Sequence, residues 1–231
     1  MFADLHIHML LSGSDWKAAI AGHQPHPDDI LIKERLSDYQ SAGISYLRDG
    51  GDRFGVCLRA KELAPEYGIT YRTPAFPIYK KSHYGSFIGR GWSDFAEYRA
   101  LLAEAQASGA DFIKLMVSGL MDFSAYGVLT EEPLTGAEMH DLIAAAHDLG
   151  FAVMAHCNGA KAVKNAVTAE VDSIEHGAVS GRRSLPYSGR KRYRLGTDSL
   201  HHRQPDRQWA VSGRCSGTYP PVGPGEYPKS R

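Results

Sequence analysis

Short apolar runs alternate with helical patterns along most of this sequence, and this alternation constrains the fold more than any other feature. Six runs have strand character, at residues 2–8, 44–48, 69–74, 112–117, 151–155 and 171–175. Helical patterns lie between them, at residues 28–42, 93–108, 135–149 and 160–169. Strands and helices that alternate in this way form a parallel sheet covered by helices. The sequence therefore predicts an α/β fold with about six βα units.

Local signals mark the ends of two of these helices and one long connection. Thr135, with Glu138 three residues later, is a capping-box pattern, and Ser93 is a candidate N-cap for the helix over 93–108. Residues 76–92 contain Pro, Gly and Tyr and connect two parts of the strand–helix pattern. We expect a long loop at the active-site mouth there.

The strand–helix pattern ends after Ala178, where the composition changes. Residues 180–231 carry 11 Lys and Arg against 3 Asp and Glu, and they contain no Ile, Phe or Met. Such a stretch buries too little apolar surface to offset the entropy cost of ordering. We interpret residues 1–179 as a partial barrel domain and residues 180–231 as a basic tail rich in Pro, Gly and Arg, either disordered or the product of a frameshift.

Composition narrows the classes of partner. The 231-residue chain has a formal net charge of zero, and no aromatic platform or DNA-reading motif accompanies the basic tail, so we expect no nucleic-acid partner. The first residues, MFADLHIH, are too short and too polar for a signal peptide, so we expect none, and no apolar run approaches the roughly 20 residues that span a bilayer. Its three cysteines fit a reduced, cytoplasmic setting better than a disulfide framework. We expect a small-molecule substrate and no membrane, and assembly into a homo-oligomer stays open.

Four histidines stand at the ends of three of the expected strands. His6 and His8 lie two apart on the first strand, so both imidazoles point to one face at its carboxyl end. His156 and His176 follow the runs FAVMA and VDSIE. A single histidine in such a place is usually structural, but strand ends in a parallel barrel converge on one mouth. The four histidines together therefore predict a metal site.

Further candidates lie near the same mouth. Lys114 sits inside the apolar run FIKLMV, where a charged lysine would be costly to bury. One interpretation is that Lys114 faces outward. The other is that it is neutralised or converted to a metal-binding carbamate, and the four histidines favour this second interpretation. Asp49 ends the second strand, where it is either a turn former or a hydrogen-bond partner of a ligand histidine. Tyr84 and Tyr126, in presumed mouth loops, are candidate substrate contacts.

These motifs together resemble the metal-dependent amidohydrolase superfamily. DLHIH at 4–8, Lys114 in FIKLM, His156 in VMAHCNG and His176 in DSIEHGA occur in the order of that family. The stretches at 43–51 and 144–167 are similar to its subgroup with imidazolonepropionase-like and prolidase-like members. The resemblance covers residues 2–178 almost continuously and implies a TIM-type (β/α)8 barrel, incomplete here.

The resemblance also implies a cofactor and a reaction. One or two divalent metal ions, zinc being the expected one, would be held by His6, His8, His156, His176 and Lys114 carboxylated by CO2. The metal would generate hydroxide from water to hydrolyse a C–N bond in an amide, lactam or dipeptide-like substrate.

The sequence departs from the family pattern at the catalytic aspartate. Asp198 stands in the expected context Gly-Thr-Asp, but only 22 positions after His176. One βα unit already needs about 30 residues, so two more units do not fit in this span. We keep Asp198 as a candidate for the catalytic aspartate, but we interpret its match to the family motif as a coincidence. We therefore expect this chain to be C-terminally truncated or frameshifted relative to the family pattern. In that case it should bind metal weakly and catalyse little turnover.

Two alternative functions stay open from the sequence. A phosphoesterase of the PHP type also opens with DLHxH on a (β/α) barrel, although Lys114 and the SIEHGA segment favour the amidohydrolase. The chain could also be an inactive truncated fragment without independent function. A comparison of hydrolysis rates distinguishes the two enzyme classes: a phosphoesterase would hydrolyse p-nitrophenyl phosphate, and an amidohydrolase would hydrolyse N-acyl amino acids.

Overall fold

The computed structural model describes residues 2–13, 15–122, 124–178 and 195–196 as an α/β fold with two parallel sheets. The first sheet has the order β1-β2-β3, and the second has the order β5-β4-β6-β7-β8-β9. Every strand pair in both sheets is parallel. The expected parallel α/β architecture is therefore confirmed. None of the described helices is long and apolar enough to cross a membrane.

The first sheet carries its own helices and its own core. Its strands are β1 (Phe2–Ile7), β2 (Ile44–Asp49) and β3 (Thr70–Arg72), and its helices are α1 (Trp16–Gly22), α2 (Asp29–Ser41), α3 (Val56–Leu63) and the 3-10 turn η1 (Ala64–Tyr67). Buried side chains of α2 and α3, among them Leu36 and Val56, pack with Leu47 of β2. The same cluster includes Ile88 and Met116, so this core continues into the rest of the molecule.

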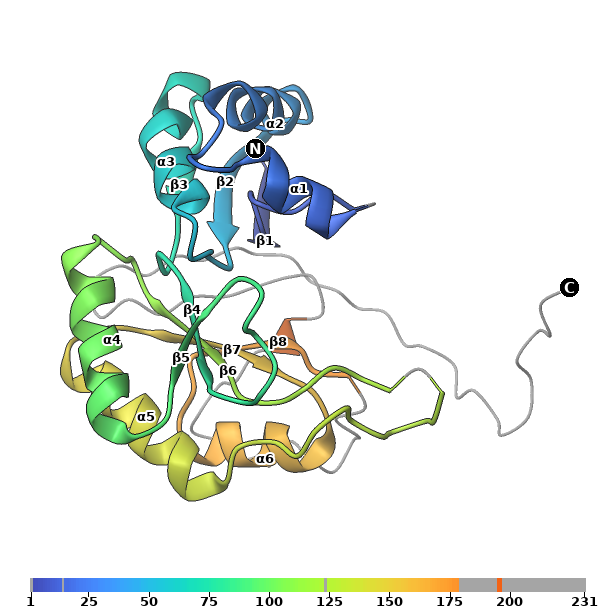
Figure 1. Ribbon diagram of the computed structural model, residues 1–231, viewed down its shortest axis with the longest axis vertical. Helices are drawn as coiled ribbons and strands as arrows, with labels where there is room; N and C mark the ends of the chain where they lie inside the picture. The colour runs from blue at the N-terminus through green and yellow to red at the C-terminus, as the bar shows by residue number, and fades with distance from the viewer. Residues whose placement is uncertain (1, 14, 123, 179–194, 197–231) are drawn as a thin grey trace, which may run out of the picture.

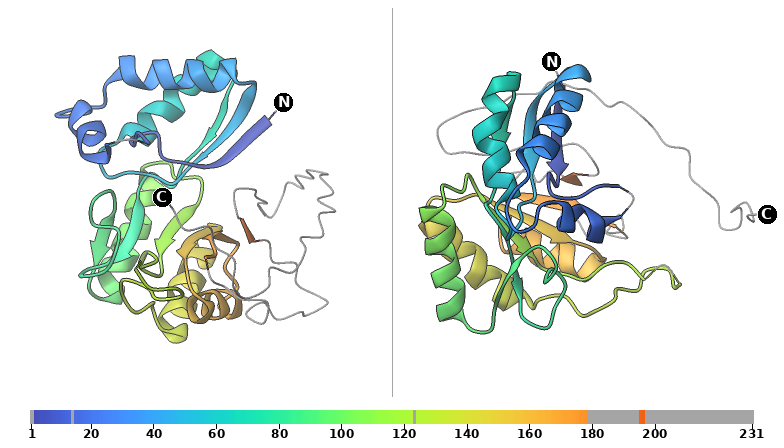
Figure 2. Two further views of the ribbon diagram at one scale, coloured as in Figure 1. Left: turned by 90° about the vertical axis from the view of Figure 1, so that its right-hand side faces the viewer. Right: turned by 45° about the horizontal axis from the view of Figure 1, so that its top comes forward.

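The second sheet is covered on one face by helices, as Figures 1 and 2 show. Its strands are β4 (Pro77–Lys80), β5 (Arg90–Trp92), β6 (Ile113–Met116), β7 (Val153–Cys157), β8 (Ser173–His176) and β9 (Leu195–Gly196), and its helices are α4 (Phe95–Ala107), α5 (Gly136–Asp148) and α6 (Ala160–Thr168). Helix α5 begins at the expected capping box of Thr135 and Glu138.

Side chains of the central strands alternate between the two faces of the second sheet. Ile113, Leu115, Val153, Ala155 and Ile174 belong to the core that includes residues of α4, α5 and α6. Period-two alternation then turns the intervening residues to the opposite, inner face. These inner residues are Lys114, Met116, Met154, His156, Ser173 and Glu175. The inner face therefore carries the polar side chains of the candidate site.

The structure corrects several expectations. Residues 76–92 are not one long loop, because they contain β4 and β5, and β4 pairs with β6 inside the sheet. Short strands in a segment with Pro and Gly give too little pattern to be read from sequence. The N-cap of α4 is Asp94 instead of Ser93, since the Asp94 carboxylate accepts from Glu97 N. Helices α1 and α3 were not expected.

The described part of the chain does not form a closed barrel. The strands divide into the two sheets, with no ladder between β3 and β4 or between β1 and β8 among the described residues. Most of the expected tail, including Asp198, lies outside the described residues. Within that tail, β9 pairs with β8 through Ile174 and Leu195.

Candidate metal centre

His6 lies on β1, and His8 directly follows the end of this strand. Their ring centroids are 5.5 Å apart. Nδ1 of His8 lies 3.2 Å from the carbonyl oxygen of Gly51. Gly50 packs against the same ring, because a Cβ at position 50 would lie 2.6 Å from Nε2 of His8. The loop after β2 therefore fixes how the His8 ring is turned.

His156 and His176 approach His6 from the second sheet. His156 is on the inner face of β7, and it is paired in register with Glu175 of β8. Regular alternation would turn His176 toward the helices, but its φ of 70° departs from the strand conformation. The His176 ring consequently lies 4.7 Å from the His156 ring and 4.9 Å from the His6 ring, centroid to centroid.

The four expected histidines thus form a row of neighbouring rings in the order His8, His6, His176 and His156. Among the residues that the structure describes, no three His, Cys, Asp or Glu side chains are already arranged to hold a metal ion. The histidines are therefore gathered at one place without forming a closed coordination shell.

Lys114 lies on the inner face of β6 and is 1% exposed. Its Nζ atom has no hydrogen-bond partner among the described residues. The pKa of Lys114 is lowered to about 8: burial is the largest cause and the charge of Arg48 adds to it, while Glu175 and Asp49 oppose the shift. A buried amine with no hydrogen-bond partner among the described residues is uncommon in a structural role.

The electrostatic environment keeps the buried histidines neutral. Burial, followed by the charge of Lys114, lowers the pKa of His6 to about 3, that of His8 to about 4 and that of His156 to about 3. Metal ligation requires neutral imidazoles. At neutral pH all three side chains are therefore in the protonation state that a metal ligand needs.

A buried ion pair that the sequence analysis did not identify lies beside these histidines. Arg48 of β2 donates to Glu175 of β8 at 2.6 Å, and Nδ1 of His6 lies 3.1 Å from the other oxygen of that carboxylate. Burial opposes ionisation of Glu175, but His6, Arg48 and Lys114 outweigh it and lower its pKa to about 2. The alternation Ser173–Glu175 within VDSIE is the signal that places this carboxylate on the inner face.

Asp49 is fully buried at the end of β2. Its carboxylate accepts hydrogen bonds from Met9 N at 2.7 Å, from the Tyr71 hydroxyl at 2.6 Å and from Gly51 N. None of these described partners is a histidine. Asp49 instead holds Gly51, the residue whose carbonyl oxygen faces Nδ1 of His8.

Asn158 is a second residue that the sequence analysis missed. Its backbone N–H donates to Ser118 Oγ at 2.8 Å, and its side-chain Nδ2 lies 3.4 Å from Nε2 of His156. Its Oδ1 accepts from Ala178 N at 3.2 Å. Asn158 thereby joins the segments that follow β6, β7 and β8 around His156.

The two expected substrate-contact tyrosines lie in different surroundings. The Tyr84 ring is half-buried and 5.0 Å from the His156 ring. Tyr126 is 90% exposed and has no described contact with the histidines. The structure thus places Tyr84, but not Tyr126, at the candidate centre.

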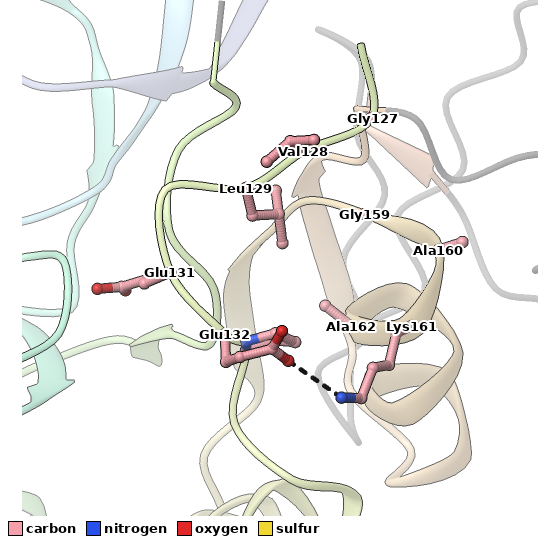
Figure 3. A pocket seen from close by; sticks show the side chains of 10 residues that line it. Gly127, Val128, Leu129, Glu131, Glu132, Gly159, Ala160, Lys161 and Ala162 are labelled. Atoms are coloured by element: carbon pink, nitrogen blue, oxygen red, sulfur yellow. Dashed lines mark hydrogen bonds and ion pairs between the residues drawn. The ribbon is translucent and has the colours of Figure 1, made fainter. Parts of the chain in front are cut away.

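A separate hollow lies beside the amino end of α6, as Figure 3 shows. Its lining includes Leu129, Glu132, Gly159 and Lys161, and Glu132 accepts from Lys161 at 3.1 Å. None of the four histidines lines this hollow. The candidate metal centre is therefore a different place on the molecule.

Solved structures with a similar arrangement of elements include a dipeptidase and an ochratoxinase. One, a Xaa-Pro dipeptidase with bound methionine in the active site, has a TM-score of 0.61 and 22% identity over 79% of this chain and 49% of its own. Another, the ochratoxinase of A. niger, has a TM-score of 0.57 and 18% identity over 75% of this chain and 46% of its own. The chain shares the fold of these solved structures.

The shared fold covers a limited part of each of these structures. The chain spans about half the length of these structures. No protein-family model and no curated protein sequence matches the chain. The comparisons therefore establish the fold, whereas the evidence for the candidate metal centre comes from the side chains of this chain.

Proposed function

We propose that the chain carries the metal-binding part of a hydrolase that cleaves C–N bonds in amide, lactam or dipeptide-like substrates. The observation that supports this most strongly is the meeting of His6, His8, His156 and His176 with a buried Lys114. These residues come from four strands of two sheets. Core packing does not require four neighbouring imidazoles on one inner face.

The donor chemistry fits a divalent ion such as zinc. Neutral imidazoles and carboxylate-like oxygens are ligands that zinc accepts. The Lys114 amine has no hydrogen-bond partner among the described residues, which supports carboxylation. In its neutral form the amine nitrogen would form an N–C bond with CO2 as one C=O π bond of CO2 opens, and the nitrogen would lose a proton to water, which leaves an anionic carbamate. We assign His6, His8, His156, His176 and carboxylated Lys114 as the residues that would hold one or two ions.

When bound, a divalent ion would lower the pKa of water and polarise the scissile carbonyl group. The chain itself would hold the donors in place: Gly50 and Gly51 orient His8, and Asn158 lies against His156. Glu175 accepts from His6 through Nδ1, which leaves Nε2 for a ligand. The expected proton-transfer residue, Asp198, lies outside the described residues, so we assign no general base.

Hydrolysis of N-acyl amino acids and dipeptides by the purified chain, with zinc and bicarbonate added, tests this function. We expect release of the amino acid to exceed release of p-nitrophenol from p-nitrophenyl phosphate. H156N should abolish the activity, whereas H140N, which changes an exposed histidine on α5, should retain it. Preferential hydrolysis of the phosphate ester would favour the phosphoesterase, and zinc binding without turnover would favour an inactive fragment.

A further inference from the structure

Three aromatic side chains form a continuous row from the candidate metal centre to the surface. The Tyr84 ring lies 5.0 Å from the His156 ring, and the Phe87 ring lies 5.7 Å from Tyr84. The Trp16 ring follows at 5.5 Å from Phe87, in an edge-on arrangement. These centroid distances are in the range of favourable aromatic contacts. We call Tyr84, Phe87 and Trp16 the aromatic row.

The outer end of the row is contributed by helix α1, which also packs against the core of the first sheet through Ile20. Helix α1 has no buried residue, and Trp16 at its first position is 46% exposed. The Asp15 carboxylate caps this helix by accepting from Lys17 N at 2.9 Å and Ala18 N at 3.0 Å. Helix α1 thus holds Trp16 against the row without burying it in the core.

The inner end of the row is held by tight packing. Tyr84 and Phe87 pack against the core of the first sheet. Gly85, with φ of 125°, lies so close to Tyr79 that a Cβ there would be 2.8 Å from the Tyr79 Cβ. The loop that carries the row therefore follows one narrow path.

A hydrogen bond ties this loop to the hairpin-like segment at 117–134. Tyr84 N donates to Glu131 Oε1 at 2.8 Å. Figure 3 shows Glu131 pointing away from α6 while its neighbour Glu132 points toward Lys161. Glu131 thus fastens this segment to the loop, so Tyr84 is held in a defined position beside His156.

We propose that the aromatic row is a substrate subsite that accepts an aromatic ring next to the bond to be hydrolysed. This inference rests on the proposed hydrolase function for the direction of the substrate. A ring extending outward from the histidines would lie along half-buried and exposed aromatic side chains, and aromatic pairs gain more than their buried area alone provides. A methyl side chain would reach little of this surface. The row therefore selects aromatic over small aliphatic substrates.

Binding of two product-like ligands to the full chain tests this subsite without requiring turnover. We would measure the Kd of N-acetyl-L-phenylalanine and of N-acetyl-L-alanine by titration, with and without zinc. Both ligands carry the same carboxylate, so the charge of Lys17 near Trp16 cancels in the ratio. We expect the phenylalanine ligand to bind about three- to tenfold more tightly.

Variants connect that preference to the row. W16A and, as a conservative change, F87L should reduce the preference toward unity. The matched control F95A removes an aromatic ring of similar exposure, 42%, from α4 on the helical face, and it should leave the preference intact.

The outcomes separate the subsite from the proposed function. An aromatic preference that W16A and F87L remove, in a chain that binds no zinc, would support the subsite and overturn the proposed function. Equal binding of the two ligands, no binding of either, or a preference that survives both variants would overturn the subsite, whatever the zinc content.

Discussion

At the scale of single residues, the candidate centre depends on small side chains that leave room for imidazoles. Gly50 lies against the His8 ring, and Gly51 offers its carbonyl oxygen to Nδ1 of His8. Asp49 secures this turn through Gly51 N and Met9 N. A change in this turn therefore acts on His8 without touching any other expected ligand.

Substitution G50A should weaken zinc binding. The added Cβ would overlap the His8 ring and force it to move. We expect a loss of affinity of about tenfold or more, as for other residues that orient a ligand histidine. Equilibrium dialysis with zinc measures this change.

Substitution G13A is the matched control for G50A, because a Cβ at position 13 meets no atom within 4 Å. Its zinc affinity should equal that of the original chain. Equal zinc affinities in G50A and G13A would remove His8 from the proposed ligand set.

At the scale of elements, the loop at 81–89 is held beside the candidate metal centre by contacts with Glu131. Glu131 accepts from Tyr84 N, and Nδ1 of His83 is 3.6 Å from the same carboxylate. Glu132, by contrast, makes an exposed pair with Lys161. Exposed pairs contribute little to stability, so the two neighbouring glutamates should differ in their effect.

Substitution E131A should loosen the loop that carries Tyr84. Hydrogen bonds to charged groups are the stronger ones, and we expect hydrogen exchange of the Tyr84 amide to accelerate about tenfold. Hydrogen exchange followed by mass spectrometry reads this effect, with E132A as the control. Similar exchange at residues 81–89 in both variants would show that Glu131 does not hold the loop.

The elements that could be predicted from the sequence are those with long, regular patterns. Helix α5 follows from its capping box and its apolar spacing, and β6 and β7 follow from continuous apolar runs. Strands β4 and β5 could not be predicted, since their sequences PIYK and RGW contain Pro, Gly and charged residues and form no continuous apolar run.

The contrast between local patterns and long-range contacts also explains which residues of the candidate site could be predicted from the sequence. His6, His8, His156 and Lys114 follow from strand alternation. The placement of His176 depends on its positive φ, which no local signal in the sequence indicates. Arg48 and Glu175 pair across 127 positions of sequence, and such long-range partners are invisible to local patterns.

At the scale of the whole molecule, the two sheets are joined by polar contacts on their inner faces. Arg48 of the first sheet donates to Leu5 O at 2.8 Å and to Glu175 and Ser173 of the second sheet at 2.6 Å and 3.3 Å. Breaking a buried pair leaves a charge without compensation. This pair should therefore control both folding stability and the position of His6.

Substitution R48M should lower the free energy of unfolding by about 3–5 kcal/mol, because Glu175 would remain buried without its partner. The double variant R48M/E175Q should regain part of this loss. The control R59M, which breaks half-exposed pairs with Asp29 and Glu62, should cost less than about 1 kcal/mol. Urea unfolding measures all three variants, and equal losses in R48M and R59M would contradict a coupling role for the buried pair.

The central claim is that the four histidines and Lys114 bind a divalent metal, and zinc content per chain tests it most directly. The full chain, dialysed against zinc and bicarbonate, should retain one or two zinc ions by elemental analysis. The variant H156N should retain less, K114M should retain at most one, and H140N should match the original chain. A zinc content near zero in the folded original chain, or one that H156N and K114M leave unchanged, would contradict the claim.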